Sequence, residues 1–163
     1  MGGRLRKLSL TAHIACSVGW LGAVAVTLAL SIAGLVSDDR AQVRAVYLTL
    51  ELSGWYVLIP LAVASLVTGL VQALATPWGL FRHYWVVVKL LMNVLATAVL
   101  LLYMQSLAHF ADLARAGAPL TRLRTPSPVL HASGAIVLLL VALTLSVYKP
   151  RGRTRYGRRR ARV

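Results

Sequence analysis

Long apolar runs and short polar connections alternate along the chain. The runs cover about residues 8–36, 45–75, 84–106 and 129–148. Each is long enough to cross about 30 Å of hydrocarbon as a helix that rises roughly 1.5 Å per residue. None shows the two-residue alternation of a barrel strand, and only helices or closed barrels satisfy their backbone groups in lipid. The pattern therefore predicts an all-α fold, a four-helix transmembrane bundle.

Polar and small residues recur at helical spacing inside each run, and they mark the face of each helix that is turned away from lipid. Pro60 falls in the middle of the second run and predicts a kink there. The four predicted inner faces comprise His13, Cys16, Trp20, Val24, Thr27, Ser31 and Gly34; Glu51, Gly54, Leu58, Ser65, Thr68 and Gln72; Trp85, Lys89, Asn93 and Thr97; and His131, Gly134, Leu138 and Ala142.

Composition and charge fit the same picture. Hydrophobic residues make up 58% of the 163 residues and charged residues 13%, which favours a single four-span transmembrane domain over residues 1–148. Eight of the eighteen Lys and Arg lie in the basic tail, residues 149–163. A basic tail directly after a span is typical of a topology signal that contacts the bilayer's anionic lipid headgroups, rather than of nucleic-acid binding. Together with Arg4, Arg6 and Lys7, it predicts a multi-pass protein of the cytoplasmic membrane with both termini in the cytoplasm.

Lys89 lies in the otherwise apolar stretch 84–92. A cation near the centre of a span costs about 2.5–3.5 kcal/mol on insertion scales unless it is paired or hydrated. Lys89 and His13 each lie about five residues inside their helices, so both are expected roughly 7–9 Å from the cytoplasmic face. Two ordinary alternatives stay open: Lys89 could extend its ammonium to the headgroups, and His13 could be satisfied by Cys16, Ser17 or a backbone carbonyl.

The shared depth of these two residues, beside Trp20, predicts a prosthetic-group site. A neutral imidazole is a good axial ligand of haem iron, and a lysine can pair with a haem propionate or act as a second axial ligand. We therefore expect haem b, with His13 as ligand of the haem iron, Lys89 at a propionate or at the iron, and Trp20 packed on the porphyrin.

A second polar layer is expected near the outer surface. Glu51 and His131 each lie a few residues inside their helices, and an ion pair between them is the simplest expectation. A proton relay or a second metal site is the functional alternative. We expect His109 in an exposed interfacial turn and His83 among the headgroups at the inner boundary.

Short motifs resemble known membrane-protein families. Residues 12–22 read AHIACSVGWLG and residues 84–91 read YWVVVKLL. They resemble the first-helix and third-helix signatures of HemJ-type protoporphyrinogen oxidases and CopD-like membrane proteins, which implies haem b binding through His13 and Lys89. The chain departs from HemJ-like proteins late in the third helix, where residues 102–105 read LYMQ and the nearest histidine is His109. The resemblance therefore implies haem binding more directly than it implies the oxidase activity.

The whole chain also resembles an uncharacterised family of four-helix integral membrane proteins from actinobacteria. Residues 79–85, GLFRHYW, and 144–152, TLSVYKPRG, carry that resemblance. The first functional hypothesis is a haem-binding protein that transfers electrons or oxidises a hydrophobic substrate. The second is copper-related transport, in which His13 and the single cysteine, Cys16, would be soft-metal ligands of an oligomer. The third is a non-catalytic accessory subunit, in which Glu51, Lys89 and the tail bind a membrane partner protein.

Overall fold

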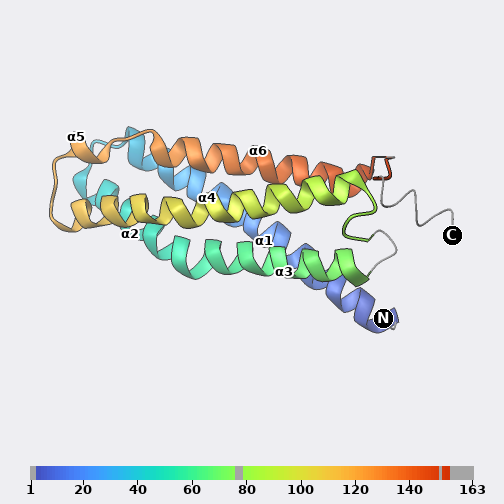
Figure 1. Ribbon diagram of the computed structural model, residues 1–163. Coiled ribbons are helices and arrows are strands. Elements are labelled where there is room, and N and C mark those ends of the chain that lie inside the picture. The colour runs from blue at the N-terminus through green and yellow to red at the C-terminus, as the bar shows by residue number, and fades with distance from the viewer. Residues whose placement is uncertain (1–2, 76–78, 151, 155–163) are drawn as a thin grey trace.

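Four long helical segments form the computed structural model, which describes residues 3–75, 79–150 and 152–154 (Figure 1). All four are long and apolar enough to cross a membrane, and the described residues contain no strand element. The predicted all-α bundle of four membrane-compatible helices is therefore confirmed. In chain order the elements are α1 (Gly3–Val36), α2 (Arg40–Ser53), the π-helical turn η1 (Gly54–Leu58), α3 (Ile59–Ala75), α4 (Tyr84–Arg115), α5 (Leu120–Leu123) and α6 (Ser127–Tyr148).

The helices are longer than the apolar runs alone predict. α1 begins at Gly3, and the second segment runs continuously from Arg40 to Ala75 through α2, η1 and α3. The largest difference is in α4, which continues to Arg115 although its apolar run ends near residue 106. Its last turns are amphipathic and bury Leu107, Ala111 and Ala114, so packing continues the helix after the hydrophobic run has ended. The predicted tail lies largely outside the described residues.

The segments are arranged as the corners of a four-helix bundle. α1 packs against α2, α3 and α6, while α4 packs against α2, α3 and α6 as well. α1 and α4 are therefore diagonal to each other, and side chains from both can meet in the bundle interior. The start of α1 and the end of α6 lie at one end of the bundle, which we call the terminal end, and α5 lies at the opposite end, the α5 end (Figure 1).

The turn η1 accommodates the proline of the second segment. Pro60 has no N–H, so it cannot donate the backbone hydrogen bond that an α-helix would require at its position. Just before it, the N–H of Ile59 reaches back to the carbonyl of Gly54, the i to i−5 spacing of a π-helical turn. Regular α-helix is thus interrupted by a widened turn that begins six residues before the proline, and the expected kink at Pro60 stays a prediction.

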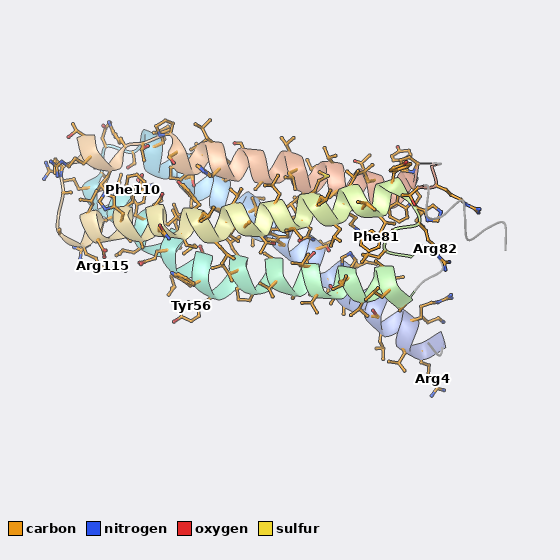
Figure 2. All side chains as sticks on the ribbon, in the orientation of Figure 1. Arg4, Tyr56, Phe81, Arg82, Phe110 and Arg115 are labelled. Carbon is orange, nitrogen blue, oxygen red and sulfur yellow. The ribbon has the colours of Figure 1, made fainter. Side chains whose placement is uncertain are left out.

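Burial follows most of the predicted inner faces. On α1 the buried residues are His13, Trp20, Val24, Ser31 and Gly34, all of them members of the predicted face. On α6 the prediction was partly wrong, because His131 and Gly134 are exposed and Ala132 is buried instead. Large apolar side chains project outward from all four segments (Figure 2), as expected for helices that face lipid.

Candidate functional site

His13 and Lys89 meet in the interior of the bundle, toward the terminal end. The Nζ of Lys89 on α4 lies 3.4 Å from the Nε2 of His13 on α1. His13 is buried and Lys89 is half-buried. Because α1 and α4 are diagonal, this contact spans the bundle rather than one helix–helix interface. The depth argument from the sequence thus located two side chains that the structure brings together.

Hydrogen bonds fix which nitrogen of His13 carries a proton. The hydroxyl of Thr68 on α3 donates to the carbonyl of Ala64 at 2.6 Å. Its oxygen therefore accepts from His13 Nδ1, 3.0 Å away, and the proton of a neutral ring resides on Nδ1. Nε2 is then a lone-pair acceptor that faces the Lys89 ammonium. Of the partners considered from the sequence, neither Cys16 nor Ser17 provides this contact, but the backbone of Ser65 also hydrogen-bonds the His13 ring.

Close backbone packing holds the His13 ring in place. A Cβ added at Gly69 would lie 3.1 Å from Cε1 of His13, so only glycine leaves full room for the imidazole against α3. Neighbouring polar side chains form a ladder between the helices: Ser17 bonds Ser65 at 2.9 Å, and Asn93 donates to the same Ser65 at 3.3 Å. Such bonds orient the helices that carry the site.

Two polar groups of this interior keep unsatisfied bonding capacity. The Oδ1 of Asn93, one helical turn from Lys89, is buried and has no hydrogen-bond partner among the described residues. Lys89 forms no ion pair with any carboxylate that the structure describes. The half-buried ammonium of Lys89 therefore contacts the neutral imidazole of His13 and has no counter-ion among the described residues.

All four acidic residues of the chain lie toward the α5 end and have other roles there. Glu51 and Asp112 both pair with Arg115, and Asp38 pairs with Arg124. Asp39 caps α2 by accepting from the backbone N–H of Ala41. They therefore cannot neutralise Lys89. This separation explains why Lys89 has no carboxylate partner among the described residues.

The prediction of an ion pair between Glu51 and His131 is wrong. Glu51 pairs with Arg115 instead, because α4 extends far enough to bring that guanidinium beside α2. His131 stacks on Tyr103, with ring centroids 3.7 Å apart, and its Nδ1 lies 2.9 Å from the carbonyl of Ser127. The sequence indicated neither Arg115 as the partner of Glu51 nor Tyr103 as the partner of His131. Arg115 in particular lies beyond the predicted end of its helix.

A cavity of about 360 Å³ lies on the α5 side of the His13–Lys89 contact, between α1, α4 and α6, with Leu50 and Leu58 of the second segment also in its lining. Trp20 borders this cavity, but neither His13 nor Lys89 does. Trp20 follows His13 by two helical turns, about 10 Å along α1. Its predicted packing on a porphyrin held by His13 stays a prediction.

The remaining candidate ligands are scattered. Cys16 is half-buried, and His83 precedes the first turn of α4. His109 is exposed, but the expectation that it lies in a turn is wrong, because α4 continues past it to Arg115. The described residues contain no group of three or more His, Cys, Asp or Glu side chains placed to hold a metal ion. Comparison of the chain with protein-family models, curated proteins and solved structures gives no match.

Proposed function

We propose that this chain is a multi-pass protein of the cytoplasmic membrane that binds a b-type haem at the His13–Lys89 contact and works in electron transfer or in oxidation of a hydrophobic substrate. Both termini face the cytoplasm in this proposal. The observation that carries it is the orientation of His13: its Nδ1 is bonded to Thr68, which leaves Nε2 as a lone pair directed across the bundle.

The chemistry of the side chains at this contact supports a haem. Imidazole ligands commonly donate their second N–H to a neighbouring acceptor, which fixes the ring and raises its basicity, and Thr68 is placed for that role. Lys89 supplies a cation that has no carboxylate partner among the described residues, and a haem propionate would supply the missing anion. A haem bound here would provide one-electron redox chemistry. The resemblance to HemJ-type proteins supports the same two residues.

Within this proposal the chain's own residues have separate roles. His13 would offer Nε2 to the iron, Thr68 would hold the imidazole in the ligating tautomer, and Lys89 would release Nε2 and pair with a propionate. The apolar side chains around the contact would exclude water. Each role predicts a different response to substitution.

The test is the absorption spectrum of protein purified in mild detergent, oxidised and dithionite-reduced, before and after addition of haem. We expect a Soret band and sharp reduced α and β bands in the wild type. The His13→Ala variant should lose them, and the Thr68→Val variant, which lacks the acceptor for Nδ1, should retain haem less well. His109→Ala is the matched control, because His109 is exposed and far along the same bundle.

A second pair of variants separates the two roles of Lys89. Arginine keeps the positive charge but stays protonated and cannot ligate iron. If Lys89 pairs with a propionate, Lys89→Arg should keep the wild-type spectrum and Lys89→Ala should lose haem. A changed spectrum in Lys89→Arg would instead make Lys89 an axial ligand. A wild type that stays colourless after haem is added would overturn the proposal and favour an accessory-subunit role.

A further inference from the structure

The cavity between α1, α4 and α6 is separate from the His13–Lys89 contact. Its lining is almost entirely apolar, with Leu and Ala side chains from α4 and α6 and Trp20 and Val24 from α1. Three of its lining residues, Leu130, His131 and Gly134, are exposed on the outer surface of α6. In a bilayer these residues face lipid, so the cavity is accessible to molecules dissolved in the membrane.

The hydroxyl groups at the lining are hydrogen-bonded within the protein. Thr27 donates its hydroxyl to the carbonyl of Ala23 at 2.9 Å, and the hydroxyls of Tyr103 and Ser127 bond each other at 3.1 Å. The imidazole of His131 keeps an acceptor at this lining. Its Nδ1 can only donate to the Ser127 carbonyl, 2.9 Å away, so in the uncharged ring Nε2 is a lone-pair acceptor. No described residue donates a hydrogen bond to that nitrogen.

The stacked pair formed by His131 and Tyr103 holds this acceptor in place. Their ring planes are 15° apart with centroids at 3.7 Å, and both rings line the cavity. His131 is hydrogen-bonded to the carbonyl of Ser127, and Tyr103 is hydrogen-bonded to the hydroxyl of the same residue. These two bonds hold the stacked rings against the start of α6. An apolar cavity with one oriented polar group is the usual form of a small-molecule site.

We propose that this cavity binds a lipophilic molecule that carries a hydroxyl group, of the phenol or quinol class. The apolar body lies among the α4 and α6 side chains, and the hydroxyl donates a hydrogen bond to Nε2 of His131. Entry is lateral, from the bilayer, past Leu130 and Gly134. The site does not depend on haem binding at His13.

The experiment compares 4-dodecylphenol with its methyl ether, 4-dodecylanisole, on protein in lipid nanodiscs, with empty nanodiscs as the baseline for partitioning. Both probes have the same apolar body, but only the phenol can donate a hydrogen bond. We expect saturable binding of both probes. The phenol should bind roughly three- to tenfold more tightly, because one net hydrogen bond changes the dissociation constant by about that factor. His131→Phe keeps an aromatic ring and lacks Nε2, so it should bind both probes with the affinity of the ether.

A cavity-filling variant tests the location. A Cβ at Gly134 meets nothing within 4 Å and Gly134 lines the cavity, so Gly134→Leu should fill it without a backbone clash and abolish binding of both probes. Gly22→Leu is the matched control, because Gly22 is equally open and does not line the cavity. Unchanged binding in Gly134→Leu would overturn the proposal.

Two further outcomes would also overturn it. Equal affinity for phenol and ether, unaffected by His131→Phe, would make the cavity a site for acyl chains only. A Soret band that is lost in His131→Phe but kept in His13→Ala would place haem, rather than a phenol, at His131. Loss of haem in His13→Ala leaves the phenol proposal untouched, so the two proposals fail independently.

Discussion

At the scale of the residue, Lys89 shows how a cation is kept inside an apolar bundle. Its ammonium donates to the neutral nitrogen of His13, and the charge itself is not cancelled by a carboxylate among the described residues. A hydrogen bond to a neutral acceptor recovers only part of the hydration that a buried cation loses. Lys89 therefore gains little stability from its own position, which is typical of a residue retained for binding.

This argument predicts the stability of the Lys89→Met variant. Methionine has a similar length and no charge, so the variant loses one hydrogen bond from a charged donor, worth about 1.5–3 kcal/mol, and no longer buries a cation, which costs about 2.5–3.5 kcal/mol on insertion scales. We expect the free energy of unfolding, measured by SDS titration in mixed micelles, to stay within about 1 kcal/mol of wild type or to rise. A decrease of more than about 2 kcal/mol would show that Lys89 is a structural anchor.

The sequence located part of this site. Because the rise per residue of a helix is nearly constant, counting residues from each helix end was enough to predict that His13 and Lys89 lie at the same depth. Thr68 was on the predicted inner face, but nothing in the sequence indicated that its hydroxyl would be bonded to Ala64 and leave its oxygen for His13. Hydrogen-bond direction depends on three-dimensional neighbours, which periodicity does not specify.

At the scale of the element, the turn η1 creates a close contact between the second segment and α4. A Cβ at Gly54 would lie 2.5 Å from the Sδ of Met104, whose side chain is 1% exposed. Met104 thus fills the space that the missing side chain leaves. The widened turn, the glycine and the methionine form one packing unit.

A double-mutant cycle tests this unit. Gly54→Ala should lower the free energy of unfolding by about 1–3 kcal/mol through overpacking, and Met104→Ala should lower it by about 2–5 kcal/mol through a cavity. Because the two side chains compete for one space, the double variant should be more stable than the sum of the single effects predicts. Gly134→Ala, where a Cβ meets nothing, should cause no loss. Additive effects would contradict direct contact.

The short helix α5 is held against α2 by one buried hydroxyl. Tyr47 is 4% exposed and its phenol donates to the carbonyl of Leu123, while Leu123 is itself buried in the same cluster. Tyr47→Phe keeps the ring and removes the donor, leaving the carbonyl unpaired. We expect a loss of about 1–3 kcal/mol in the free energy of unfolding. Hydrogen exchange of residues 120–124 should accelerate; unchanged exchange there would mean that Tyr47 does not hold α5.

Elements at the α5 end were the least predictable part of the fold. Hydrophobicity predicted four spans because lipid-facing positions are apolar at every depth. It did not predict the last turns of α4 or the helix α5, since polar residues alternate with buried ones there. The wrong prediction for Glu51 followed directly, because Arg115 lies beyond residue 106, the predicted end of the third run. Ends of membrane helices are set by packing and ion pairs rather than by hydropathy.

At the scale of the whole molecule, charge is divided unequally between the two ends. The α5 end carries all four acidic residues and five arginines: Arg40, Arg44, Arg115, Arg122 and Arg124. Arg4 and Arg82 lie at the terminal end and Arg115 at the α5 end (Figure 2). The sequence adds Arg6, Lys7 and the eight cations of the tail next to the terminal ends of α1 and α6. Since Lys and Arg near spans favour the cytoplasm, the terminal end is the one predicted to stay inside.

Single cysteines can test this orientation in intact cells. In a Cys16→Ser background, Ala116→Cys would mark the α5 end, where position 116 is exposed, and Gly3→Cys would mark the terminal end. A membrane-impermeant maleimide should label Ala116→Cys directly and Gly3→Cys only after permeabilisation. The reverse pattern would contradict the proposed orientation and would place the His13–Lys89 contact nearer the outer surface. Redox partners for that site would then have to be sought outside the cell, because His13 lies much closer to Gly3 along α1 than to the α5 end.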